Sequence, residues 1–228
     1  MKKTGMIIGL VFALALSVLA VEYKYIEKAK NVSSGNIADC WRCQRATIMM
    51  DQNVEMTLVM NGYKDVAAFV AGKTNSGLIV SDLDNVQEMP EYNEVFLAIL
   101  GKLTEAGSVF AGGILKEKTV GEGEDAVTYQ YIEKNIECGT GDIAQCWRSQ
   151  MLKIKMGESV TISVRMLGYS DIDAFVAGKS VIEVQKSTID NAQEMPEYST
   201  AFTAIFNKLT EAGEDFEGGI LKTVEIEE

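Results

Sequence analysis

The sequence has no histidine among its 228 residues. Histidine is the commonest general base and metal ligand near neutral pH, so its absence removes the usual centre of many catalytic and metal sites. A Gly-x-Ser-x-Gly elbow, a phosphate-binding loop and a dinucleotide fingerprint are also absent. Hydrolase and nucleotide-dependent functions therefore have no motif to support them.

Proline and positive charge are scarce. Only 2 prolines occur, Pro90 and Pro196, which argues against proline-rich linkers. The formal net charge is −12, and such an excess of carboxylates repels nucleic-acid phosphates and anionic lipids. We therefore expect no nucleic-acid partner. A composition with 47% hydrophobic and 24% charged residues is typical of globular proteins.

Long hydrophobic runs are absent after the first twenty residues. Lys2 and Lys3 precede an apolar run from Met6 to Ala20, which predicts a secretory signal peptide over 1–20 with cleavage after Ala20. The run is shorter than the roughly 20 residues that a spanning helix needs, although retention as an anchor remains the alternative. The prediction is an exported protein, periplasmic or extracellular, without stable membrane insertion after cleavage.

The rest of the chain repeats itself at an offset of 106 residues. "NVQEMPEY" at 85–92 returns as "NAQEMPEY" at 191–198, and "KLTEAG" at 102–107 returns at 208–213. Units of about 100 residues are long enough to carry their own cores. We therefore predict two tandem homologous α+β domains, packed as an intramolecular pseudo-dimer. The predicted boundaries are repeat unit 1 at 21–120, an acidic glycine linker at 121–126 and repeat unit 2 at 127–228.

Local patterns predict the elements inside each unit. In the second copy, alternating residues over 151–156 and 160–166 predict a hairpin, followed by a short helix at 172–177 and a strand at 181–189. Pro196 begins a helix with one apolar face that ends before Gly213, and the last strand covers 219–226. The helix and strand at 196–222 resemble the closing segment of small dimeric α+β barrel proteins of the antibiotic-monooxygenase type. No functional residue is transferred from this resemblance.

The four cysteines are the most distinctive candidates. "IADCWRCQ" at 37–44 has the spacing of thiol–disulfide motifs, whereas "IAQCWRSQ" at 143–150 has lost the second cysteine. Asn36 and Asp142 are plausible helix N-caps, which would place Cys40 and Cys43 on one helical face. In an oxidising compartment we favour the disulfides Cys40–Cys43 and Cys138–Cys146 over a Cys40–Cys146 bridge. Redox chemistry at Cys40 and Cys43 is the less favoured alternative.

Other candidates concern ligand and cation binding. Tyr23 and Tyr25 share a face of a predicted strand and, with the tryptophans, are candidates for an aromatic groove, although core packing is favoured. Asp82, Asp84 and Glu88 are weak candidates for a cation, and we expect neither a bound metal nor a cofactor. The ligand-binding candidates are Trp41, Arg42, Trp147, Arg148, Tyr63 and Tyr169.

The sequence favours a binding or interaction module over an enzyme. The expected partner is an unknown small molecule or protein. A thiol–disulfide redox protein using Cys40 and Cys43, and an enzyme with carboxylate chemistry, are the two alternatives.

Overall fold

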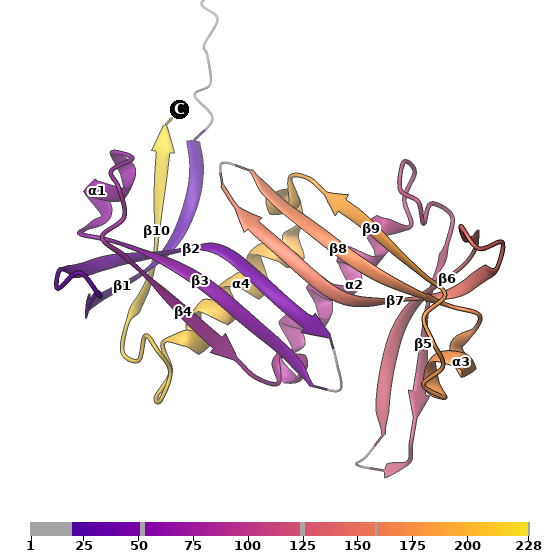
Figure 1. Cartoon of the computed structure of the whole chain (residues 1–228). Helices are drawn as coiled ribbons and strands as arrows, with labels where there is room; N and C mark the ends of the chain where they lie inside the picture. Colours follow the sequence, from indigo (N-terminus) through magenta and orange to yellow (C-terminus); the bar gives the residue numbers. More distant parts are fainter. Residues whose placement is uncertain (1–19, 51–52, 124–125, 158, 228) are drawn as a thin grey trace, which may run out of the picture.

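The structure, a computed structural model, describes residues 20–50, 53–123, 126–157 and 159–227. Of these residues, 49% lie in strands and 22% in helices. The strands of this part of the chain form a single antiparallel sheet, which curls into a half-barrel (Figure 1). The predicted signal peptide lies outside the described residues, except for Ala20, which begins the first strand.

Each repeat contributes five strands in the same order. The first contributes β1 (Ala20–Asn31), β2 (Ile37–Met50), β3 (Val54–Tyr63), β4 (Gly77–Leu83) and β5 (Ile114–Val120). The second contributes β6 (Val127–Glu137), β7 (Ile143–Met156), β8 (Val160–Tyr169), β9 (Glu183–Ile189) and β10 (Ile220–Glu227). The helices are α1 (Val66–Val70), η1 (Val86–Glu88) and α2 (Pro90–Leu103), then α3 (Ile172–Val176), η3 (Ala192–Glu194) and α4 (Pro196–Leu209).

The prediction of two tandem α+β domains is wrong, because the repeats exchange their last strands within one sheet. β10 of the second repeat pairs with β1 of the first, from Val21↔Ile226 to Glu27↔Ile220. β5 of the first repeat pairs in the same way with β6 of the second. Each repeat therefore depends on the other for a strand, and the architecture is mostly antiparallel β.

The two halves also join at the centre of the sheet. β2 pairs with β7 over five residues, and Thr47 faces Lys153, which is its equivalent at the offset of 106. A register shift after Cys43, and another after Ser149, marks a bulge in each strand. Bulges bend a strand and strengthen its twist. The first half of β2 can consequently pair with β1 while its second half pairs with β7.

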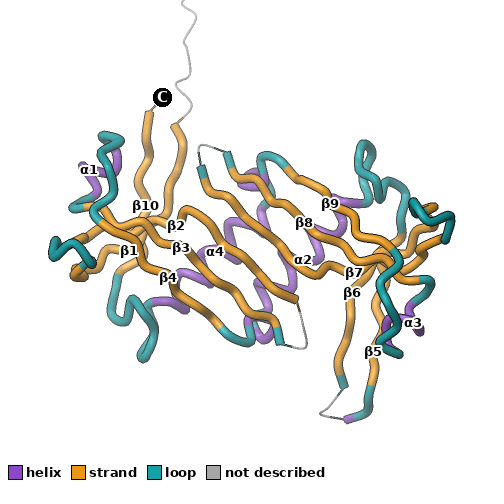
Figure 2. The backbone as a smooth tube through the Cα atoms, viewed as in Figure 1, coloured by secondary structure: helices purple, strands orange, loops and turns teal. Residues whose placement is uncertain are grey.

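The long helices cover one face of this sheet. α2 and α4 lie behind the central strands in Figure 1 and contact each other. Ile48, Leu58, Leu152 and Ile162 point from the sheet into the core that these helices close. The short helices α1 and α3 lie toward the ends of the molecule (Figure 2), where they pack on β2 and β3 and on β7 and β8, respectively. No helix in the described part of the chain is long and apolar enough to cross a membrane.

Several predicted elements are confirmed. The hairpin at 151–166 is present as the ends of β7 and β8, and the helix that begins at Pro196 buries its predicted apolar face. The short helix at 172–177 is α3, and its cap is Asp171, whose Oδ1 accepts a hydrogen bond of 2.6 Å from the backbone N–H of Ala174. An aspartate at this position satisfies an amide that the helix itself leaves unpaired.

The helix expected after Asn36 is instead part of strand β2. The segment pairs with β1 between Ile37 and Trp41 and with β3 from Cys40 onward, and these tertiary hydrogen bonds outweigh the local capping pattern. The bulge after Cys43 also hides the alternation that marks a strand. The equivalent segment after Asp142 is part of β7 for the same reason.

Candidate functional site

A pocket of about 560 Å³ lies between the N-terminal part of β1, the middle of β2 and helix α4. The turn between β7 and β8 and the short helix η3 complete its wall. The first repeat therefore supplies one side of the pocket and the second repeat supplies the other. The apolar side chains that line it are Val21, Tyr23, Cys43, Met156, Val160, Tyr198, Phe202 and Phe206.

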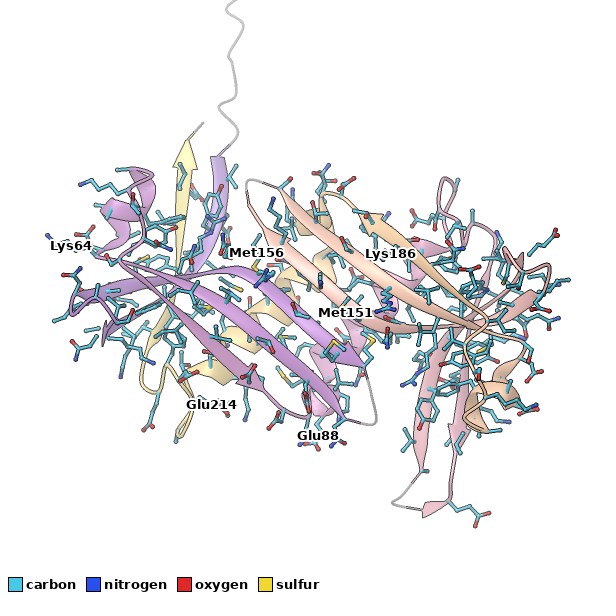
Figure 3. The ribbon with its side chains drawn as sticks, in the orientation of Figure 1. Lys64, Glu88, Met151, Met156, Lys186 and Glu214 are labelled. Carbon is cyan, nitrogen blue, oxygen red and sulfur yellow. The ribbon has the colours of Figure 1, made fainter. Side chains whose placement is uncertain are left out.

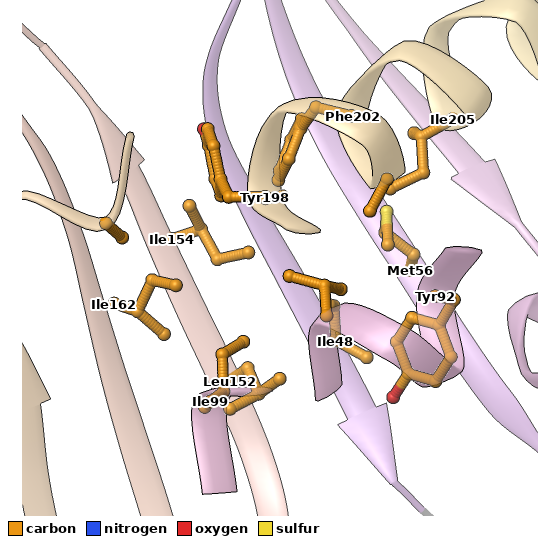
Figure 4. Close-up of a cluster of buried hydrophobic side chains, with 14 of the residues drawn as sticks. Ile48, Met56, Tyr92, Ile99, Leu152, Ile154, Ile162, Tyr198, Phe202 and Ile205 are labelled. Atoms are coloured by element: carbon orange, nitrogen blue, oxygen red, sulfur yellow. The ribbon is translucent and has the colours of Figure 1, made fainter. Parts of the chain in front are cut away.

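Helix α4 supplies the aromatic wall. Tyr198, Phe202 and Phe206 are spaced four residues apart, so they lie along one side of the helix. The rings of Tyr198 and Phe202 are 4.4 Å apart between centroids, and Phe202 meets Phe206 edge-on at 6.0 Å. Figure 4 shows Tyr198 and Phe202 beside Ile154, which belongs to the core. The three aromatic side chains of the wall are thus held in place by their packing against the main core.

Arg42 brings a positive charge to the pocket. Its guanidinium lies 4.3 Å from the ring centroid of Tyr23 and 5.1 Å from that of Phe69, and Nη2 donates a hydrogen bond of 3.1 Å to the carbonyl of Gly157. These cation–π contacts hold the Arg42 guanidinium in place without neutralising its charge. Among the described residues Arg42 forms no ion pair with a carboxylate. The other N–H groups of Arg42 can donate hydrogen bonds to a ligand.

Lys24 fastens β1 to the helix of the other repeat. Its Nζ donates hydrogen bonds of 2.8 Å to Ser199 Oγ and 2.8 Å to Thr203 Oγ1. Both hydroxyls are on α4, one turn apart, so the ammonium bridges the edge of the pocket. This contact fixes the distance between the strand and the aromatic wall.

The Tyr198 hydroxyl is the polar group on the aromatic wall. It makes no hydrogen bond to the described part of the chain, and its oxygen is not among the fully buried polar atoms. Burial of the side chain raises the pKa of Tyr198, as does the nearby Cys43 thiol, so the phenol stays protonated at neutral pH. A protonated phenol can donate to an acceptor on a ligand.

The equivalent polar groups in the other half are buried. Tyr92 and Ser149 correspond to Tyr198 and Cys43 at the offset of 106. The Tyr92 hydroxyl and the Ser149 hydroxyl are both fully buried and lack a hydrogen-bond partner in the described part of the chain. Lys24 is replaced by Gln130, and Phe206 by Leu100. The second copy therefore provides natural controls for the first.

All four cysteines are buried free thiols in the structure. Cys40 and Cys43 lie on opposite faces of β2: Cys40 packs with Tyr25 and Phe69, whereas Cys43 belongs to the main core. Cys138 and Cys146 are likewise divided between the main core and a cluster with Tyr131. Neither favoured disulfide is present in the structure. For Cys40 and Cys43 the reason is that a spacing of three in a strand puts the side chains on opposite faces, whereas a helix would bring them together.

Three of the thiols, Cys40, Cys43 and Cys146, are also held in the protonated form. Burial raises the pKa of Cys40, Cys43 and Cys146 to about 12 in each case. The nearby Asp65 raises the pKa of Cys40 further, while Arg42 acts in the opposite direction. A nucleophilic thiolate needs a lowered pKa and access to solvent, and Cys43 has only 1% of its surface exposed.

The remaining ligand candidates are divided between core and surface clusters. Trp41 and Trp147 are fully buried, and their indole N–H groups donate to the carbonyls of Lys28 and Lys134. Tyr63 packs on Phe69, and Tyr169 packs on Phe175. Arg148 lies over Tyr129 and Phe175, as Arg42 lies over their equivalents. Arg42 is thus the one of these six candidates that lines the pocket.

The acidic candidates lie at the end of β4 and in the following loop. Asp82 accepts a hydrogen bond of 2.7 Å from Thr57 Oγ1, Asp84 follows the strand, and Glu88 lies in η1. Within the described ranges, no group of three or more acidic or cysteine side chains is placed to hold a metal ion.

The sequence identified the apolar face of helix 196–209 but not its use as a pocket wall. Tyr198, Phe202 and Phe206 follow the pattern of any core-facing helix, so their sequence carries no sign of a cavity. The exchange of strands between repeats brings β1 against α4, and this tertiary event creates the pocket. Comparisons of the chain with protein-family models, curated proteins and solved structures find no match.

Proposed function

We propose that this is an exported binding protein that holds a small, largely apolar molecule with one anionic group in the pocket between β1, β2 and α4. The observation that carries the proposal is an aromatic pocket in which the Arg42 guanidinium forms no ion pair with either lining carboxylate, Glu22 or Glu194. Pockets of roughly 300–1,000 Å³ with apolar walls and a few polar groups are the usual sites for small ligands.

The polar groups indicate the orientation of the ligand. The apolar part would lie against Phe202 and Phe206, and the anionic group would face Arg42. The Tyr198 hydroxyl offers one further donor at the same wall. Arginine suits this role because its guanidinium stays charged and binds planar anions through two parallel hydrogen bonds.

Binding is preferred to thiol–disulfide chemistry on geometric grounds. A redox pair needs two thiols that can reach each other and one that ionises readily. Cys40 and Cys43 lie on opposite faces of β2, and burial raises the pKa of both. The carboxylate-enzyme alternative needs a buried carboxylate pair, and no aspartate or glutamate of the described residues is buried.

Export remains part of the proposal. Cleavage after Ala20 would remove only the first residue of β1 and would retain the pairs with β10 from Val21↔Ile226 onward. The part of β1 that lines the pocket begins at Val21, so the mature chain would keep every lining residue of that strand.

The test uses two fluorescent probes of similar shape. 8-Anilinonaphthalene-1-sulfonate carries a sulfonate, whereas N-phenyl-1-naphthylamine has the same rings without the charge. The mature protein should bind the sulfonate dye more tightly. Arg42→Gln should weaken that binding by about tenfold to a hundredfold, because a hydrogen bond to a charged group contributes about 1.5–3 kcal/mol. Binding of the uncharged dye should change less than twofold.

Arg148→Gln is the matched control, since Arg148 occupies the same position in the second copy. It should leave the binding of both dyes unchanged. A cooperative thermal transition for each variant excludes dye binding to a partly unfolded state. Equal loss of affinity in Arg42→Gln and Arg148→Gln, or no binding by the folded wild type, would disprove the proposal.

A further inference from the structure

The sheet face opposite α2 and α4 carries five cationic side chains, which together form the basic face. Figure 3 shows two residues of this side, Met151 and Lys186, in front of the central strands. The cationic positions alternate along the strands with buried residues such as Ile48 and Leu152, so they project away from the helices. The basic face consists of Arg45, Lys153, Lys155, Arg165 and Lys186.

The register of the strands places these charges side by side. Arg45 is directly opposite Lys155 across β2 and β7, and Arg165 is directly opposite Lys186 across β8 and β9. Lys153 is two residues from Lys155 on the same strand. Like charges in direct cross-strand pairs destabilise a sheet. The arrangement is unusual in a chain with a net charge of −12.

The cations of the basic face are not ion-paired within the described residues, whereas Lys102, Lys208 and Lys222 each pair with a glutamate. The Arg165 Nε is buried and has no hydrogen-bond partner there. Three carboxylates lie at the margin of the basic face. Glu55 and Asp82 are paired in register with Met49 and Thr57, and Asp190 Oδ1 lies 3.5 Å from the hydroxyl of Thr161, the register partner of Lys155.

Hydroxyl groups cross the basic face in one row. Thr57 pairs with Thr47, Thr47 with Lys153, Lys153 with Ser163, and Ser163 with Thr188. With strands about 4.8 Å apart, the row from Thr57 to Thr188 is about 19 Å long. The hydroxyls of Thr47, Ser163 and Thr188 make no side-chain hydrogen bonds within the described residues.

We propose that the basic face binds an acidic polysaccharide, with its carboxylate or sulfate groups on the cations and its hydroxyls on the Thr and Ser row. Charge complementarity supplies the attraction, and the flat row matches an extended polymer. The register rows that carry the cations hold no aromatic side chain, so unpaired nucleic-acid bases have nothing to stack on. None of the five cationic residues of the basic face lines the pocket, so the two sites use different side chains.

The first test measures binding of the mature protein to polygalacturonate, with neutral dextran as the uncharged polymer. Polygalacturonate should bind and should be released by added salt, because exposed charges are screened. Lys153→Gln with Lys155→Gln should weaken binding at least tenfold. The matched control, Lys102→Gln with Lys208→Gln, removes the same charge from the helices and should change binding less than twofold.

The second test separates a sugar polymer from other anions. Thr47→Val with Ser163→Ala should weaken binding to polygalacturonate severalfold and leave binding to linear polyphosphate unchanged. Equal loss for both polymers, tighter binding to polyphosphate or to phosphatidylglycerol vesicles, or no binding to polygalacturonate at low salt would overturn the proposal. Circular dichroism spectra that match the wild type establish that each variant is folded.

Discussion

Cys40 and Cys43 are a C-x-x-C pair that the strand separates. Trp41 and Cys43 face the main core, while Cys40 and Arg42 face the other side of β2. The spacing is typical of redox motifs only when a helix brings both thiols to one face. In this protein the two cysteines fill different cores, and Ser149 takes the place of Cys43 in the second copy.

The buried thiols should be unreactive in the folded protein. At pH 8 the thiolate fraction is very small, because burial raises the pKa of Cys40, Cys43 and Cys146 to about 12. Reduced protein should show no fast reaction with 5,5′-dithiobis(2-nitrobenzoate), and all 4 thiols should react after addition of denaturant. Rapid modification of Cys40 in folded protein would contradict this account of the site.

Tyr92 and Tyr198 should respond differently to loss of their hydroxyls. Tyr92→Phe removes a buried hydroxyl without a partner, so it should raise the free energy of unfolding by about 1 kcal/mol. Tyr198→Phe should leave stability nearly unchanged and weaken binding of the sulfonate dye severalfold. Urea unfolding and dye titration of both variants measure the two effects. If Tyr92→Phe weakened dye binding and Tyr198→Phe raised stability instead, the dye-binding pocket would belong to Tyr92 and not to Tyr198.

At the scale of elements, local patterns predicted most helices and strands. The strand predicted over 181–189, observed as β9 (Glu183–Ile189), and the helix starting at Pro196 follow from alternation, proline and an apolar face. The helix predicted after Asn36 is wrong, because the bulge after Cys43 interrupts the alternation of the strand and the residues around Asn36 resemble a helix start. The pocket could not be predicted, since no local pattern shows that β1 will contact α4.

Two glycine substitutions distinguish tight packing from free space. A Cβ at Gly62 would lie 2.7 Å from the Trp41 ring and 2.8 Å from the Ala38 Cβ. Gly62→Ala should therefore lower the free energy of unfolding by about 1–3 kcal/mol or more. Gly101→Ala, inside α2 with no atom within 4 Å, should raise it by about 0.5–1 kcal/mol. Chemical denaturation measures both, and equal effects would show that Trp41 is loosely packed.

At the scale of the whole molecule, strand exchange makes the repeats interdependent. The duplication at an offset of 106 was evident from the sequence, but the partner of each last strand was not. The same local patterns are compatible with a last strand that pairs inside its own repeat and with a last strand that pairs with the other repeat. The structure pairs β10 with β1 and β5 with β6, so neither repeat completes a sheet alone.

Cutting the connection between the repeats tests this interdependence. A protease site inserted within 121–126, between β5 and β6, should give a cleaved protein whose halves elute together in size-exclusion chromatography and separate only in denaturant. The paired strands continue to hold the halves after the chain is cut. Elution of each half as a folded monomer would show that the repeats are independent domains.

The central claim is that the pocket formed by this exchange binds an apolar anion at Arg42. The most direct measurement is a crystal structure of the mature protein with 8-anilinonaphthalene-1-sulfonate. The account predicts the naphthalene ring against Phe202 and Phe206, with the sulfonate within hydrogen-bond distance of the Arg42 guanidinium. Dye bound elsewhere, or a pocket left empty beside saturating dye, would contradict it.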